Sequence, residues 1–214
     1  NLPVGINILD ANDQQLGDTH ACPGLHGEAS SGNLLAIACD TGLLLVTDSA
    51  GGPQITHLPY DEALPEGKSS TLLGGVGIQY FLSNYGADRV VLIDPHQETF
   101  RLVDLPTRRV HFAVDSVRPQ FAYIFTEGGN LHRLNTLSGE ISATLALTEP
   151  YSMDGHWSDP RPRIAVAGDE ILVTDPNASQ IHRIDANAFE LAGTIPVDGL
   201  PMGIVVAGGS GAVH

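Results

Sequence analysis

Apolar residues in this chain fall in short alternating runs that return with a regular period. In four segments an apolar run ends at an Asp or Asn, a polar turn follows, and a second apolar run leads to a proline. Alternation of this kind predicts half-buried strands joined as hairpins. The segments are LLLVTDSAGGPQITHLP (43–59), VVLIDPHQETFRLVDLP (90–106), LHRLNTLSGEISATLALTEP (131–150) and IHRIDANAFELAGTIPVDGLP (181–201).

Further apolar runs lie between these segments and complete the repeat. Each period therefore carries about four short strands in roughly 45 residues, which is typical of a β-propeller blade. A two-layer β-sandwich is the alternative all-β fold, but it does not require such a period. The additional runs are LLAIAC (34–39), IQYFLSN (78–84), FAYIFTE (121–127) and RIAVAGDEILVTD (163–175).

The two ends of the chain carry incomplete repeats. The segment INILDANDQQLGD (6–18) is a partial copy with Asp10 at its turn, and GIVVAGGSGAVH (203–214) resembles the inner strand of a further blade. Complete propellers are closed rings of about 4–8 blades. We therefore expect residues 1–214 to form one propeller domain, a partial ring that is incomplete on its N-terminal side. The missing N-terminal half, or another copy of the chain, is expected to supply the remainder.

Composition and charge narrow the class of partner. The chain has 214 residues, 24 Gly and 14 Pro, and only 6% aromatic residues, which favours short strands and tight turns. Its formal net charge of −15 argues against binding to nucleic acid or to an anionic membrane surface, and favours a cationic ligand. No apolar run approaches the ~18 residues of a membrane span.

Histidines stand near the start of three predicted inner strands, which in a propeller converge on the central channel. These strands are expected to begin near residues 25–29, 70–75, 110–115, 154–159 and 202–209. Imidazoles with one carboxylate suit tetrahedral Zn²⁺, although copper binds the same groups. The sequence predicts a site made by His26, His111 and His156, with either Asp154 or Glu28 as the carboxylate and His20 as a further candidate. The repeat positions of His57, His96, His132 and His182 favour structural roles.

The two cysteines permit two interpretations. Cys22 precedes a predicted inner strand and Cys39 ends the next strand, so an antiparallel hairpin brings them to the same side of one blade, where a disulfide can form. Alternatively, Cys22 remains a thiolate and joins His20 and His26 in a zinc or copper site. The hairpin geometry favours the disulfide.

One stretch also carries a family resemblance. The segments HACPGLHGEA (20–29) and GNLLAIACDTGLLLV (32–46), with blades that end in HLP and DLP, resemble the periplasmic zinc metallochaperones of Azt-type zinc ABC importers. The resemblance implies a β-propeller that binds Zn²⁺ near its channel and passes it to the periplasmic solute-binding protein of the importer. Such proteins are about twice as long as this chain.

Three functions follow from these observations. The first is a non-enzymatic zinc metallochaperone of the periplasm. The second is a metal-dependent hydrolase similar to propeller lactonases, with Glu28 or Asp115 as the general base; the chain has no Ser-His-Asp spacing, and GEASSG (27–32) lacks the G-x-S-x-G order. The third is a protein-binding propeller whose histidines are structural.

Overall fold

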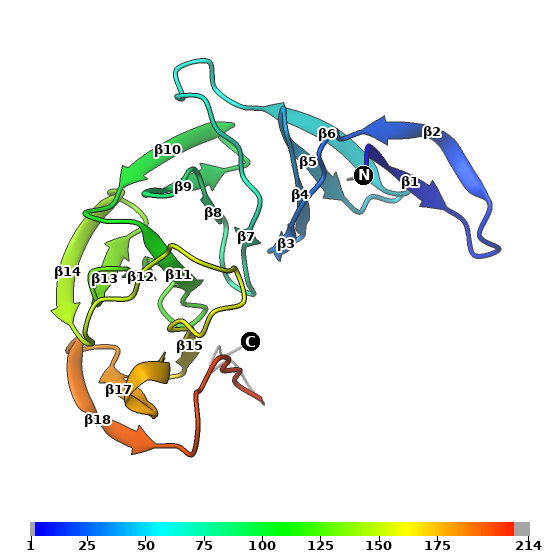
Figure 1. Cartoon of the computed structure of the whole chain (residues 1–214). Coiled ribbons are helices and arrows are strands. Elements are labelled where there is room, and N and C mark those ends of the chain that lie inside the picture. Colours follow the sequence, from blue (N-terminus) through cyan, green and yellow to red (C-terminus); the bar gives the residue numbers. More distant parts are fainter. Residues whose placement is uncertain (1–2, 208–214) are drawn as a thin grey trace. The chain divides into compact units, whose positions relative to one another are not determined.

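The structure is a computed structural model that describes residues 3–207 (Figure 1). In this range the chain forms 18 β-strands and one three-residue 3₁₀ helix, Pro176–Ala178, which confirms the all-β prediction. Among residues 3–207 no helix has the length and apolar character that a membrane crossing needs. The chain divides into two compact units, unit 1 (Asn1–Gly86 with Val90–Leu102) and unit 2 (Ala87–Arg89 with Val103–His214).

Four of the sheets are antiparallel and four-stranded, and in each the strands lie side by side in chain order. This is the arrangement predicted for propeller blades, and it confirms the fold class. The first sheet contains β3 (Glu28–Ser31), β4 (Leu34–Cys39), β5 (Gly42–Thr47) and β6 (Gln54–Pro59). The second sheet contains β7 (Leu72–Leu73), β8 (Phe81–Asn84), β9 (Arg89–Asp94) and β10 (Thr99–Asp104). The third sheet contains β11 (Arg109–Val114), β12 (Phe121–Thr126), β13 (Asn130–Asn135) and β14 (Glu140–Ala146). The fourth sheet contains β15 (Ile164–Ala167), β16 (Glu170–Asp175), β17 (Gln180–Asp185) and β18 (Glu190–Pro196).

The start of unit 1 is a separate two-stranded hairpin, β1 (Gly5–Leu9) with β2 (Gln15–Ala21). Its turn is at the predicted residue, because Oδ1 of Asp10 accepts hydrogen bonds from the backbone N–H groups of Asn12 and Gln14, each at 2.8 Å. The single domain expected over residues 1–214 stays a prediction, as does a further blade strand near the C-terminus, most of which lies outside the described residues.

Each unit has its own core between two sheets. In unit 1, residues of β4 and β5 such as Ala36 and Leu43 pack with Phe81 of β8 and Ile93 of β9. In unit 2, Phe125 and Leu131 of the β11–β14 sheet pack with residues of the β15–β18 sheet. Because both faces of the central strands are covered, these strands are apolar at nearly every position rather than at alternate ones.

The Asp or Asn that ends the third strand makes the same pair of hydrogen bonds in three blades. Its side-chain oxygen accepts two backbone N–H groups of the turn that follows: His96 and Gln97 for Asp94, Leu137 and Ser138 for Asn135, Asn187 and Ala188 for Asp185. A short side chain with an oxygen can close such a turn, which explains the repeated residue type. In the turn after Asp48 the side-chain contacts come from Ser49 instead.

Candidate functional site

The segment with the two cysteines is fixed by a disulfide. Cys22 and Cys39 are bonded, with 5.0 Å between their Cα atoms, and both are almost fully buried, against Ile37 and Leu44. Backbone hydrogen bonds on either side, such as His26 N–H to the Ala38 carbonyl at 3.1 Å, hold this segment alongside β4. The predicted bridge is confirmed, and Cys22 is therefore excluded as a thiolate ligand.

The ring of His26 is held in place by a backbone carbonyl. Its Nδ1 lies 2.8 Å from the backbone carbonyl of Ser70, which can only accept, so Nδ1 carries the proton and Nε2 keeps its lone pair. A ring fixed by a carbonyl in this way is the usual arrangement at protein metal sites. Gly27 makes the close approach possible, because a Cβ there would lie 2.5 Å from the same carbonyl oxygen. Glu28, two residues after His26, is exposed like the histidine.

His20 belongs to the same unit but to the β1–β2 hairpin. It is half-buried, and its backbone pairs with that of Ile6 on β1. Cys22, two residues further on, donates its backbone N–H to the Val4 carbonyl at 2.8 Å, so the disulfide also anchors the base of this hairpin.

In His111 on β11, Nδ1 accepts a hydrogen bond, whereas in His26 it donates one. The backbone N–H of Ile164 donates to its Nδ1 at 3.1 Å, so in the neutral ring the proton is on Nε2. Burial, followed by the positive charges of Arg163 and Arg109, lowers the pKa of His111 to about 4. To bind a metal through either nitrogen, His111 would have to give up this hydrogen bond or change its tautomer.

His156 and Asp154 lie in a loop rather than in a strand. The expectation that an inner strand begins within residues 154–159 is wrong, because the first strand of this blade is β15, at Ile164. Pro160 and Pro162 explain the delay, since neither has a backbone N–H to donate to a sheet. His156 Nδ1 lies 2.8 Å from Ser158 Oγ.

Asp154 is engaged by a cation. Its Oδ1 accepts from Arg108 at 2.8 Å, and this hydrogen bond lowers the pKa of the exposed carboxyl group. Arg108 also contacts Glu127 at 2.8 Å. A metal ion would therefore have to compete with Arg108 for this carboxylate.

The six predicted ligands are divided between the two units. His20, His26 and Glu28 lie in unit 1, and His111, Asp154 and His156 lie in unit 2. Within residues 3–207 no group of three or more His, Cys, Asp and Glu side chains is placed to hold a metal ion together. His26 combines a ring held through Nδ1 by a backbone carbonyl with an unprotonated Nε2, whereas Nδ1 of His111 and of His156 accepts from a backbone N–H group.

Three histidines that the repeat assigned to structure have partners inside their blades. His57 Nε2 lies 3.1 Å from Thr41 Oγ1, and His182 Nε2 lies 3.1 Å from Asp175 Oδ2. His132 is buried between the hydroxyl groups of Thr126 and Thr144, at 3.0 and 2.9 Å, and burial lowers its pKa. These contacts join a strand to a neighbouring strand or turn of the same blade, so they stabilise the blades.

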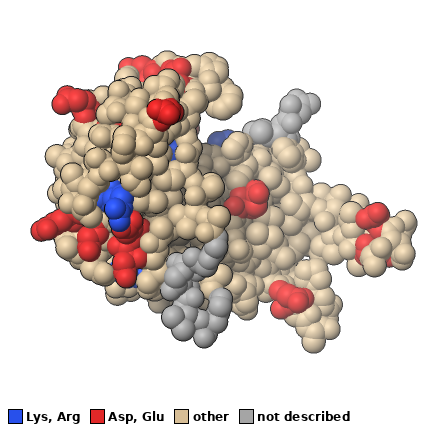
Figure 2. All heavy atoms as spheres, turned by 90° about the horizontal axis from the view of Figure 1, so that it is seen from below, with Lys and Arg blue, Asp and Glu red and all other residues tan. Residues whose placement is uncertain are grey.

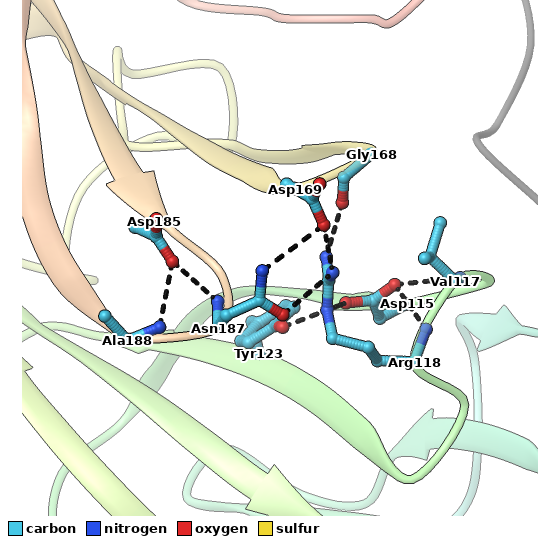
Figure 3. A network of polar contacts seen from close by, with 9 residues as sticks. All are labelled: Asp115, Val117, Arg118, Tyr123, Gly168, Asp169, Asp185, Asn187 and Ala188. Atoms are coloured by element: carbon cyan, nitrogen blue, oxygen red, sulfur yellow. Dashed lines mark hydrogen bonds and ion pairs between the residues drawn. The ribbon is translucent and has the colours of Figure 1, made fainter.

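Sequence reasoning overlooked a buried ionic network in unit 2 (Figure 3). Asp115 is fully buried and accepts hydrogen bonds from the Arg118 guanidinium and the Tyr123 hydroxyl, each at 2.9 Å, and from two backbone N–H groups. Arg118 continues to Asp169 at 2.9 Å and to the Gly168 carbonyl. Because its oxygens are used in this way, Asp115 is a structural residue rather than a free general base.

The surface agrees with the charge of the sequence. On the face drawn in Figure 2, Asp and Glu side chains are scattered over the molecule, and Lys and Arg appear only in small isolated areas. Such a surface repels polyanions and attracts cations.

Comparisons with known proteins were made by family model, by sequence and by structure. No family model matches the chain. The zinc chaperone AztD of Citrobacter koseri is 55% identical over 213 residues, which is 99% of this chain and 51% of that protein. The chain thus spans about half the length of this curated relative.

Solved structures extend the comparison to the fold. A crystal structure of Citrobacter koseri AztD matches with a TM-score of 0.94 and 55% identity over all of this chain and 57% of that one. The structure of apo AztD from the same organism matches with a TM-score of 0.91 and 54% identity over 94% of this chain and 55% of that one. The dihydro-heme d1 dehydrogenase NirN, at 13% identity and a TM-score of 0.58 over 88% of this chain and 41% of that one, shows a likeness of fold alone.

Proposed function

Since the chain belongs to the AztD family of zinc chaperones, we propose that it holds Zn²⁺ as cargo and passes it on, without chemical turnover. The observation that carries the proposal is His26, whose ring is fixed through Nδ1 while Nε2 points a free lone pair away from the Ser70 carbonyl. The net charge of −15 favours accumulation of a divalent cation.

We propose His26 as the first protein ligand of Zn²⁺ and Glu28 as the second. They are two residues apart and both exposed, and together they leave open positions on a tetrahedral ion. The remaining ligands are proposed to come from the part of the longer protein that this chain does not include, with His20 as the nearest further candidate along the chain. An incompletely enclosed ion can be taken over by an acceptor one ligand at a time.

The proposed compartment is the bacterial periplasm, and the proposed acceptor is the solute-binding protein of a zinc ABC importer. The Cys22–Cys39 disulfide supports the compartment, because such bonds persist in oxidising surroundings. The family relationship supports the acceptor.

A competition titration with a chromophoric zinc chelator tests the proposal in the full-length protein. His26→Ala should weaken Zn²⁺ binding at least tenfold, whereas His57→Ala, which removes an exposed histidine that contacts Thr41, should leave it unchanged. Affinity should also fall as the pH drops toward ~6, because protons compete for imidazole nitrogens. Equal affinities of the His26→Ala variant and the unmodified protein would contradict the assignment.

Transfer and catalysis are separated by a second pair of measurements. Zinc-loaded protein should lose its metal to the solute-binding protein faster than to a matched concentration of free chelator. The same sample should not hydrolyse simple lactones above the rate of free Zn²⁺. Lactone turnover that disappears in the Glu28→Gln variant would instead favour the hydrolase.

A further inference from the structure

Unit 2 contains a cavity of about 320 Å³ beside the loop that precedes β15. Its size is at the lower end of the range for small-molecule sites. The lining combines apolar side chains, an indole and two guanidinium groups. The residues are Val110, Met153, Gly155, His156, Trp157, Arg161 and Arg163.

Arg161 builds one wall of this cavity. Its side chain is 6% exposed and donates to three backbone carbonyl oxygens of the loop, those of Ser152, Asp154 and His156, each at 3.0 Å. The nearest carboxylate oxygen, on Asp159, lies 3.6 Å away. Most of the donors of Arg161 are therefore used to hold the loop in shape.

Arg163 is different, because its charge has no counterpart. Within residues 3–207 its guanidinium group forms no ion pair, and the one hydrogen bond of that group is a long contact of 3.5 Å to the Pro162 carbonyl, while its backbone pairs with Thr174. Burial, with the neighbouring charge of Arg161, lowers the pKa of Arg163. A half-buried guanidinium group with most of its N–H donors unused is costly to hold.

The surroundings also determine which ligand would relieve this cost. An anion would offset the charge, and a carboxylate matches the planar fork of a guanidinium group. Trp157 is 82% exposed, its ring centroid lies 5.4 Å from that of His156, and it presents a flat apolar surface at the same cavity. Zn²⁺, by contrast, would be repelled by two arginines.

We propose that this cavity is a binding site for a small organic anion, a carboxylate with a flat apolar body. The carboxylate pairs with Arg163, and the apolar body lies against Trp157, Val110 and Met153. Arg161 acts as a positioning residue that holds the loop. The site uses no side chain of the proposed zinc ligands His26 and Glu28, so it stands or fails separately from the proposed function.

Trp157 makes the proposal testable because it is the single tryptophan of the 214-residue chain. Benzoate is titrated while the tryptophan fluorescence is recorded, and calorimetry is run in parallel so that a spectroscopically silent complex is still detected. We expect saturable binding of benzoate and at least tenfold weaker binding of benzamide, which has the same shape without the charge. Acetate, which lacks the ring, should also bind more weakly.

Variants identify the residue responsible. Arg163→Gln should weaken benzoate binding at least tenfold, with an unchanged circular dichroism spectrum. Arg183→Gln, which removes an arginine paired with Glu170 elsewhere in unit 2, should bind benzoate as the unmodified chain does. Equal affinities of Arg163→Gln and the unmodified chain would overturn the proposal.

Two further arms test the chemistry of the ligand. Inorganic phosphate that binds as tightly as benzoate would overturn the choice of a carboxylate with a flat body. Zn²⁺ and a chelator should each leave the benzoate affinity unchanged. If Zn²⁺ instead displaces benzoate, and His156→Ala abolishes the displacement, the cavity is a metal site and the proposal is wrong.

Discussion

Reduction of the Cys22–Cys39 disulfide should destabilise the chain by a predictable amount. The bond joins residues 17 positions apart, and both sulfur atoms lie in a buried apolar cluster that also packs against Ile6 of the hairpin. For a loop of this length, the chain-entropy treatment gives a loss of about 3 kcal/mol on opening. The cluster remains apolar when the thiols form, so loop entropy should dominate the change.

Urea unfolding with and without a reductant measures this loss. With a typical denaturant dependence of ~1–3 kcal/mol per molar for a domain of this size, the midpoint should fall by about 1 to 3 M. The Cys22→Ala/Cys39→Ala double variant is the control, because reductant should not change its midpoint. Its midpoint should lie near that of the reduced chain.

An equal urea midpoint for the oxidised chain and for the reduced chain, with two titratable thiols, would contradict this stabilisation. That result would mean that the loop is already constrained in the unfolded state. Zinc affinity provides a second readout, because the segment between Cys22 and His26 is held to β4 by the bond. Reduction should weaken Zn²⁺ binding, though less than His26→Ala does.

Three other substitutions, one of them with a matched control, test separate parts of the fold. Burial lowers the pKa of His111 to about 4 in the native state, against ~6.5 in the unfolded chain. The stability of the fold with the neutral ring is therefore complete above pH ~6.5, and up to about 3 kcal/mol of it is lost as the pH falls toward 4. In His111→Asn the urea midpoint should depend less steeply on pH over this range. Gly42→Ala should lower the free energy of unfolding by about 2 kcal/mol or more, because φ is +144° and the new Cβ would lie 2.1 Å from a backbone oxygen. The control is Gly17→Ala, at φ +71° with open space around it, which should cost less stability in the same denaturation assay. Asp115→Ala should cost about 3–5 kcal/mol in thermal or urea unfolding, because the Arg118 guanidinium loses its buried carboxylate and keeps only the exposed one of Asp169, and the Tyr123 hydroxyl and two backbone N–H groups lose their acceptor. A loss below about 1 kcal/mol would contradict the role of the network.

The blades were predictable from the sequence because their rules are local. Short apolar runs bounded by turn residues give the strands, and a side-chain oxygen that accepts two turn N–H groups requires Asp or Asn where β9, β13 and β17 end. The disulfide was predictable for a related reason, since it joins two neighbouring antiparallel segments of one blade.

The candidate site was less predictable, because it depends on the hydrogen bonds of individual rings. The sequence places His26 and His111 at similar points of their blades, yet one ring donates to a carbonyl and the other accepts from an N–H group. Repeat alignment also extended a strand into residues 154–159, where Pro160 and Pro162 together with Arg161 produce a loop. The unpaired charge of Arg163 arises from tertiary packing, which no spacing rule reports.

The loop before β15 owes its form to contacts with carbonyl oxygens, which every amino acid supplies. As long as Arg161 is retained, an exposed side chain such as Trp157 can change without loss of this backbone frame, whereas Gly155, at φ +98°, and Met153, which packs against the core of unit 2, are fixed by the fold. Relatives of this protein are thus free to diversify what the loop recognises while the blade beneath it stays the same.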